Sequence, residues 1–382
     1  MSYGRDILHG ISLYAHEQRQ WLITLNERGL LDNPPAWLKN WNGDGIISRT
    51  ANPKSLKILN QLDCHQVELL GDGRNRPTDV FEDEKEICRL GFDHFLDRGI
   101  THYAFYAYGN CWWIQYRLNT YVELLQKSGI HCHVLAEKTD QPSNLHPIWD
   151  DRYEKPLIRW LRALPKPVGL MTLYDFQSAL VIGACHKAGI AVPEEVLVLG
   201  TSNDEHICHL TTPSISSIDP NACQIGYEAA RLLDLKMNKK QLPDIPVIVA
   251  PKGVVQRRSS DMIAVKDPDV VAALVFIRKN IYSGITVNDV VREVSISQSS
   301  LLRLFKKHFG RTPEQEICRL RITRAKELLC NTNYTISDIA MLSGFASPEY
   351  FVKVFKLNTG MTPIQYRKKE QKFIHTSPQN YS

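Results

Sequence analysis

Basic side chains recur on two amphipathic segments, 50 residues apart, near the C-terminal end of the chain. Arg303 has the planar donor geometry that pairs with O6 and N7 of guanine. Helical phase and charge together predict a set of candidate DNA contacts: Gln298, Ser299, Leu302, Arg303, Lys306 and Lys307 in the first segment, Glu349, Val352, Lys353 and Lys356 in the second, and Arg367 beyond it. The lysines and Arg367 are expected at backbone phosphates. Glu349 either accepts from a cytosine amino group or is simply solvated.

The charge of the chain is unevenly divided. Residues 266–375 hold 18 Lys/Arg and 10 Asp/Glu, whereas the rest of the chain holds 28 Lys/Arg and 31 Asp/Glu, out of totals of 46 and 41. A net of +8 on the C-terminal part therefore accompanies a net of −3 before it. A basic module is typical of proteins that meet a polyanion, although a solvated charged face would have the same composition.

These basic segments belong to an internal duplication. Eight residues each have a matching type 50 positions later: Ser297, Leu301, Arg303, Phe305, Lys306, Gly310, Thr312 and Pro313. Upstream, Thr286 and Asp289 match Thr335 and Asp338 at an offset of 49, so one turn is a residue longer. Two short helices joined by a tight turn, the second basic outside and apolar inside, predict a helix-turn-helix in each copy. A plain helical hairpin within a bundle is the alternative.

Capping residues mark where the predicted helices begin and end. Thr286 and Ser297 are N-cap types, and Asp289 would lie in a first turn near the positive end of the helix dipole. Gly310 stands where a left-handed helix end is expected. Thr312 followed by Pro313 restarts a helix, and the second copy repeats this order at Thr335, Ser347, Gly360 and Thr362-Pro363.

The helical region resembles the AraC-type DNA-binding domain. The resemblance is carried by Arg321–Leu329, Ser343–Lys356 and Gly360–Arg367, and it covers about the last 110 residues. It implies a long linking helix, here 314–329, between two helix-turn-helix units that enter successive major grooves of double-stranded DNA.

The region before residue 257 alternates buried strand patterns (46–47, 102–106, 168–172, 196–200) with amphipathic helical patterns (86–98, 116–128, 176–188, 221–237). This alternation predicts a mostly parallel sheet covered by helices, and about 250 residues suggest two lobes. Ligands of such folds bind at the carboxyl ends of the strands. We expect a sensing domain at 1–257, a linker at 258–266, an all-α DNA-binding domain at 267–372 and a tail at 373–382.

The N-terminal region resembles the periplasmic-binding-protein-like core of LacI-type regulators. Met171–Leu180, Ala188–Gly200, Ala229–Leu233 and Val249–Ser260 carry the pattern. The resemblance implies a cytoplasmic homodimer whose lobes close on a small sugar, a xylose-like pentose being the expected effector. It further implies activation of sugar catabolism genes through RNA polymerase.

Six residues are candidates for the effector site: Trp112, Trp113, Arg117, Asp175, Ser202 and Asn203. Arg117 matches the family's sugar-binding arginine, at the expected start of a helix. Either tryptophan offers an aromatic face for the C–H side of a sugar, and Asp175 follows a strand. Arg117 as a surface residue and the tryptophans as core are the alternatives.

Two departures from the family pattern concern this site. The family usually has an aspartate where Ser202 stands, and Asn203 and Asp204 are the alternative candidates for its role. A helix opens the chain where the family has a strand before it, so the first sheet is expected to lack a strand, through a start codon assigned too far downstream or a degenerate sensor. If the sensor is degenerate, the N-terminal domain would serve only as a dimerisation scaffold.

Catalysis, metals and cofactors are not expected. The sequence contains no phosphate-binding Gly-rich loop and no nucleophile elbow, so an enzyme fused to a regulator is the less favoured alternative. Nine scattered cysteines without a C-x-x-C pair indicate a reducing cytoplasm. Adjacent residues of His131-Cys132-His133 would point to opposite faces of a strand, which argues against one metal holding all three. No apolar run is long enough to span a membrane.

Overall fold

The computed structural model describes residues 2–18, 21–70, 79–109, 111–137, 151–262, 264 and 267–371. It divides into two compact units, Met1–Met262 and Ile263–Ser382. The expected tail at 373–382, residue 372 and linker positions 263, 265 and 266 lie outside the described residues. Among the described residues, no helix is long and apolar enough to cross a bilayer.

The smaller lobe of the first unit is built on two parallel strand pairs. Strand β1 (Gly45–Ser48) pairs with β2 (His65–Glu68), and β3 (Val80–Glu82) pairs with β9 (Val247–Val249). A bridge between Glu68 and Asp79 connects the pairs. Helix α2 (Pro53–Leu59) and the short η1 (Ala36–Asn40) pack together in this lobe.

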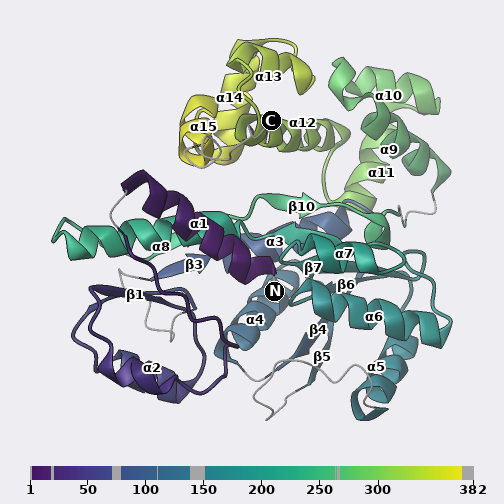
Figure 1. Cartoon of the computed structure of the whole chain (residues 1–382). Helices are drawn as coiled ribbons and strands as arrows, with labels where there is room; N and C mark the ends of the chain where they lie inside the picture. The colour runs from purple at the N-terminus through teal and green to yellow at the C-terminus, as the bar shows by residue number, and fades with distance from the viewer. Residues whose placement is uncertain are drawn as a thin grey trace, which may run out of the picture. The chain divides into compact units, whose positions relative to one another are not determined.

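Two helices cross closely beside these strands. Helix α1 (Ser2–Gln18) runs along α8 (Ala222–Met237), which in turn packs on β1, β2, β3 and β9 (Figure 1). A Cβ at Gly10 would lie 1.8 Å from the carbonyl oxygen of Cys223, and one at Gly226 would lie 1.9 Å from that of Ile7. The close crossing therefore requires glycine on both helices.

The larger lobe is a six-stranded sheet with strand order β10-β8-β7-β6-β4-β5. All its pairings are parallel except that of β10 with β8. The strands are β4 (His102–Tyr108), β5 (Cys132–Glu137), β6 (Val168–Thr172), β7 (Val196–Thr201), β8 (Ser216–Asp219) and β10 (Gly253–Val255). Strands β6 and β7 are buried along their whole length, because helices cover both faces of a parallel sheet.

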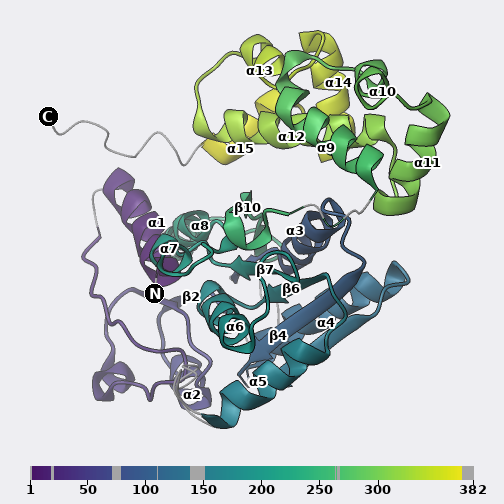
Figure 2. The same cartoon turned by 90° about the vertical axis from the view of Figure 1, so that its right-hand side faces the viewer.

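Helices α3 (Glu84–Leu96) and α4 (Trp112–Lys127) cover one face of this sheet, where Phe95 packs on Tyr103 and Tyr121 on Phe105. Helices α5 (Asp151–Ala163), α6 (Asp175–Ala188) and α7 (Glu205–Leu210) cover the other (Figure 2). The chain passes between the lobes after β3, β8 and β9. The expected two-lobed periplasmic-binding-protein-like α/β fold is confirmed.

The end of this unit corrects the expected linker. Residues Arg258–Ser260 form a 3₁₀ turn, η2, in which Ser259 and Ser260 are fully buried against the larger lobe. The prediction that a polar, basic segment lies between domains was wrong for these three residues. The hydroxyls of Ser259 and Ser260 can be buried without a large cost because each has a hydrogen-bond partner within the lobe.

The second unit is all helical, as expected. Helices α9 (Pro268–Asn280), η3 (Ile281–Ser283), α10 (Val287–Val294) and α11 (Gln298–Phe309) surround one core; α13 (Ile336–Leu342), α14 (Pro348–Thr359) and α15 (Pro363–Gln371) surround another. Helix α12 (Pro313–Asn331) contributes to both cores. The linking helix predicted over 314–329 is thus confirmed.

The duplicated capping residues make the same contacts in both copies. Thr286 and Asp289 form a capping box at the start of α10, and Thr335 and Asp338 form one at the start of α13. Gly310 and Gly360 both end their helices with positive φ, 65° and 75°. The turn between paired helices holds two residues before Ser297 and four before Ser347. The second copy has one more residue between its caps, and α13 ends one residue earlier relative to its cap.

Candidate functional site

Helix α11 presents its predicted DNA contacts to solvent. Ser297 caps the helix by accepting from the backbone N–H of Ser300, 3.1 Å away. Leu301, Phe305 and Phe309 are buried on the inner face. The exposed positions are Gln298, Ser299, Leu302, Arg303, Lys306 and Lys307. The apolar face thus anchors a helix whose outer face carries three cations.

Helix α14 repeats this arrangement with two differences from expectation. Glu349, Lys353 and Lys356 are exposed, but Val352 is only partly exposed and packs against the core of Phe351 and Phe355. Val352 therefore belongs more to the core side than its helical phase suggested. Tyr350, which the sequence analysis did not select, is 51% exposed in the first turn.

Arg367 does not lie free at the surface as a phosphate contact would. It donates from Nη2 to the carbonyl oxygen of Tyr334 at 2.5 Å, which ties α15 to the segment before α13. Burial lowers the pKa of Arg367 from its ordinary value. Residue type and charge alone led to its selection, and they do not reveal a carbonyl 33 residues away.

Arg321 on α12 joins the two helix-turn-helix units. Its guanidinium donates to the carbonyl oxygens of Ile281 at 3.4 Å and Ile285 at 2.6 Å in the first helix-turn-helix half. It also lies 6.0 Å from the ring centroid of Phe345 in the second half. Beside it, Gly344 approaches the Ile281 carbonyl so closely that a Cβ would lie 2.4 Å from it. The two helix-turn-helix halves are therefore packed against each other through α12 and are not joined by the chain alone.

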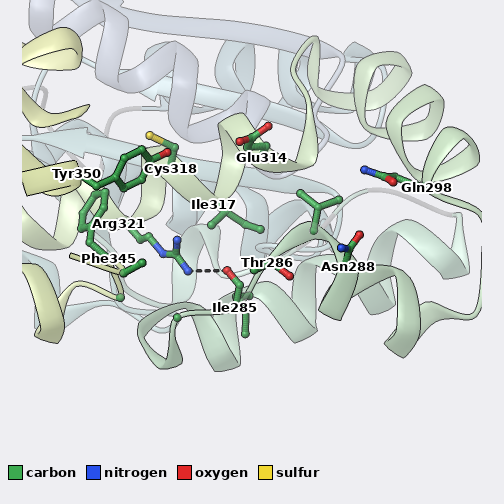
Figure 3. A pocket seen from close by; sticks show the side chains of 14 residues that line it. Ile285, Thr286, Asn288, Gln298, Glu314, Ile317, Cys318, Arg321, Phe345 and Tyr350 are labelled. Atoms are coloured by element: carbon green, nitrogen blue, oxygen red, sulfur yellow. Dashed lines mark hydrogen bonds between the residues drawn. The ribbon is translucent and has the colours of Figure 1, made fainter. Parts of the chain in front are cut away.

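A pocket of about 390 Å³ lies at this junction. Figure 3 shows Gln298 of α11 and Tyr350 of α14 at opposite sides of it, with Glu314, Ile317 and Arg321 of α12 between. Both α11 and α14, here called the reading helices, line the pocket with residues of their first turn. The pocket therefore belongs to the surface between these two helices.

In the first unit, Arg117 lies where the two lobes meet. It is 4% exposed, in the second turn of α4 rather than at the expected helix start, because α4 begins at Trp112. Its Nε and Nη2 donate to Glu84 at 2.6 and 2.9 Å, its Nη2 also to Glu82 at 2.6 Å, and its Nη1 to the carbonyl oxygen of Leu173 at 2.9 Å. Burial acts to lower the pKa of Arg117, but the charges of Glu84 and Glu82 outweigh it and raise that pKa. The cation is retained, and each of its three nitrogens has a hydrogen-bond acceptor.

Polar and aromatic groups at the ends of neighbouring strands surround this ion cluster. Arg49 follows β1, and its guanidinium carbon lies 4.7 Å from the ring centroid of Tyr3. Trp113 lies 6.5 Å from Tyr174, centroid to centroid, whereas Trp112 is 41% exposed and packs on Tyr116. Among the described residues, the buried Nε atoms of Arg49 and Trp113 have no hydrogen-bond partner. Trp113 is therefore the better placed of the two tryptophans.

Asp175 is inside the larger lobe rather than open to a ligand. It is 1% exposed and accepts from the hydroxyl of Ser217 at 2.5 Å and from the backbone N–H of Asp204 at 2.7 Å. Burial raises its pKa to about 7. Its carboxylate thus holds the loop after β7, in which Ser202 and Asn203 have positive φ of 116° and 49°.

Within that loop, Asn203 is already engaged. Its side-chain oxygen accepts from Arg257 at 2.9 Å, and its backbone N–H donates to Ser217 at 3.0 Å. Sequence reasoning missed Tyr3, Arg49, Glu82, Glu84 and Arg257. Glu82 ends a three-residue strand that was not predicted, and Glu84 begins the helix after it; their position at the end of a strand was the available signal.

Two family matches cover most of both units. Residues 92–260 match the periplasmic binding protein-like domain, and residues 290–369 match a helix-turn-helix domain.

Relatives and a solved structure match nearly the whole chain. The xylose operon regulatory protein of Haemophilus influenzae is 29% identical over 376 residues, covering 96% of this chain and 95% of that protein. A solved xylose-binding transcription activator superposes with a TM-score of 0.59 at 26% identity, covering 97% of this chain and 96% of that one. The melibiose operon regulatory protein of Escherichia coli is 35% identical over 103 residues, 27% of this chain and 34% of that protein.

Proposed function

We propose that this chain is a DNA-binding transcription regulator that joins a periplasmic-binding-protein-like domain to an AraC-type helix-turn-helix domain, and that a small sugar bound where its lobes meet controls its action on DNA. A pentose is the proposed effector class, with D-xylose first among candidates, since relatives are named for xylose. We further propose that the protein acts in the cytoplasm as a homodimer, activates transcription through RNA polymerase and has no catalytic activity.

The observation that carries the sugar proposal is the group of polar and aromatic side chains around Arg117. Sugars are bound by planar donors and acceptors for their hydroxyls and by an aromatic face for their C–H side. Arg117 supplies donors, Glu82 and Glu84 supply acceptors, and Trp113 supplies the ring. Glu82 comes from β3 of the smaller lobe and Glu84 from the start of α3, and together they compensate for the acceptor that Ser202 lacks.

Of the six candidate effector contacts, the proposal retains Arg117 and Trp113 as direct ones. A sugar hydroxyl would take over part of the bonding that Arg117 now gives to Glu82 and Glu84. Trp112, Asp175, Ser202 and Asn203 are proposed as surrounding residues, because the first is exposed and the others are bonded within the larger lobe or belong to its strained loop. At the DNA-reading end, Gln298, Ser299 and Arg303 are proposed as base contacts and the lysines as phosphate contacts.

A thermal-shift screen of full-length protein tests the sugar proposal. At 100-fold excess over the dissociation constant, a ligand of the native state adds about 2.7 kcal/mol, which corresponds to roughly 5–10 °C for a unit of this size. D-xylose, L-arabinose, D-ribose and D-glucose form the panel. We expect one pentose to give such a shift, and Glu82→Gln to weaken its binding at least tenfold.

Glu86→Gln is the matched control, because Glu86 lies four residues further along the chain than Glu82, in α3, and pairs with Arg89 at the surface. Its sugar affinity is expected to equal that of the wild type. If no sugar stabilises the wild type even at 100 mM, the N-terminal unit is a scaffold and the proposal is wrong.

A further inference from the structure

Residues Arg257–Ser260, here called the linker root, lie just before the end of the first unit, at Met262, from which the chain enters the DNA-binding unit. Their surroundings are unusual for a connection between domains, because Ser259 and Ser260 are fully buried. The Ser259 hydroxyl donates to Val198 of β7 at 2.7 Å and accepts from the backbone N–H of Ser216 at 2.9 Å. A loose tether would need none of these bonds.

The first set of contacts to the linker root comes from the loop after β7. The Arg257 guanidinium donates to Asn203 at 2.9 Å and to the carbonyl oxygen of Ile215 at 3.0 Å. Asn203 lies in the loop that Asp175 holds by bonding Ser217 and the backbone of Asp204. That loop is also bonded to the smaller lobe, since the backbone N–H of Ser2 in α1 donates to the carboxylate of Asp204 at 3.1 Å. A movement between the lobes therefore acts on the partner of Arg257.

The second set comes through helix α3. Its first residue, Glu84, bonds Arg117 in the ion cluster between the lobes. Near its other end, His94 contacts the Ser260 hydroxyl at 2.7 Å, and Arg98 donates from Nε to the Ser260 carbonyl at 2.5 Å. A helix of 13 residues spans about 20 Å and transmits displacement as a rigid body. One end of α3 thus lies at the proposed sugar site and the other at the linker root.

We infer that the linker root is the output of the sensing unit, and that Arg257 and Ser260 are positioning residues that convey sugar occupancy to the DNA-binding unit. This inference rests on the proposed sugar response. When a sugar replaces part of the Glu84–Arg117 bonding, α3 and the loop at Asn203 shift together. The 3₁₀ turn that both hold shifts with them and changes how the DNA-binding units are presented. Neither residue contacts sugar or DNA.

The test measures coupling rather than binding. The probes are D-xylose, or the panel sugar giving the largest thermal shift, and the tightest duplex selected from random DNA by the full-length wild type. The coupling factor is the ratio of DNA dissociation constants without and with saturating sugar. Linkage requires the same factor for sugar affinity without and with DNA. For Arg257→Gln and Ser260→Ala we expect the factor to fall from at least tenfold to below threefold, with sugar affinity in the absence of DNA within threefold of wild type.

Arg89→Gln is the matched control, since Arg89 lies on α3 but pairs with Glu86 and Asp93 at the surface; it should keep the full factor. If the coupling factor of the wild type is one, so that sugar does not change DNA binding, the sugar response itself is overturned. A wild-type factor that persists in both Arg257→Gln and Ser260→Ala would overturn only the role of the linker root. If Arg257→Gln does not fold, Ser260→Ala decides alone, since it removes one hydroxyl from a buried site.

Discussion

Arg303 and Arg367 carry the same charge in the same unit but lie in different surroundings. Arg303 is exposed on the outer face of α11, whereas Arg367 is half-buried and bonded to the Tyr334 carbonyl. An exposed guanidinium in the middle of a reading helix is free to form the bidentate pair with guanine. One that already bonds a carbonyl holds an element in place. The surroundings of each arginine, not its type, separate the two roles.

Replacing Arg303 and Lys306 should have different consequences. Arg303→Ala is expected to cost about 1–3 kcal/mol on the preferred duplex and to relax preference at one base pair. Lys306→Ala should weaken binding evenly on all sequences and reduce the slope of log K against log salt by about 1. Titrations of a set of single-base-pair variants at several salt concentrations check both. An unchanged base preference in Arg303→Ala would place the base contacts elsewhere.

Asp175 should make the first unit less stable at alkaline pH. Burial raises its pKa to about 7, well above the ordinary value of 3.8, so the folded state holds a proton that the unfolded chain releases. The stability that Asp175 contributes is then fully present below about pH 4 and is lost as the pH rises through 7. Between pH 5 and 8 the contribution is about 2–3 kcal/mol. Glu68, whose pKa burial also raises to about 7, acts in the same direction.

Urea unfolding at pH 5 and 8 measures this dependence. Asp175→Asn resembles the protonated acid and should flatten it by about 2–3 kcal/mol. A variant as pH-dependent as the wild type would show that Asp175 is ionised in the fold.

At the scale of elements, caps and crossings decide how the repeated helices are assembled. The capping boxes at Thr286, Thr312 and Thr335 act within single turns. The joining of the two helix-turn-helix units is different in kind, because it depends on Gly344 lying against the Ile281 carbonyl and on Arg321 of α12. Each copy therefore forms its helices locally, and α12 with this contact sets how the two reading helices are spaced.

Gly344→Ala and Gly310→Ala form a matched pair that isolates this contact. Both glycines have positive φ, 80° and 65°, so both substitutions carry a backbone cost of about 1–2 kcal/mol. Only at Gly344 would the new Cβ meet a backbone atom, at 2.4 Å, while nothing lies within 4 Å at Gly310. We expect Gly344→Ala to cost about 2 kcal/mol more than Gly310→Ala in thermal unfolding of the second unit. Equal losses would show that the units are not held at this point.

At the scale of the first unit as a whole, the lobes are joined by charge as well as by chain. Arg117 of the larger lobe bonds Glu82, the last residue of β3 in the smaller lobe, and Glu84, the first residue of α3. Arg117 is 4% exposed and each carboxylate 16% exposed, so the three largely buried charges are satisfied only while all three groups are present. The same groups are those proposed to meet the sugar, so ligand binding and lobe closure depend on one cluster.

Arg117→Met should therefore destabilise the first unit by about 3–5 kcal/mol, since it leaves two carboxylates without their cation. Arg231→Met removes a surface pair with Glu228 and should cost less than 1 kcal/mol. Urea unfolding followed by tryptophan fluorescence compares the two variants. Equal small losses would mean that the cluster is already well hydrated.

The sequence by itself determined the duplicated helix-turn-helix, the helix boundaries at its caps, the outward basic faces and the alternation of strands and helices. These features depend on residues within one or two turns of each other, where periodicity and capping chemistry act. Only the tertiary structure decided that Arg117 meets Glu82 and Glu84, 35 and 33 residues away, and that Arg257 meets Asn203, 54 residues away. It also showed that Asp175 and Arg367 are bonded internally and that Ser259 and Ser260 are buried. Such pairings depend on which strand ends the topology brings together, and no local pattern in the chain records that.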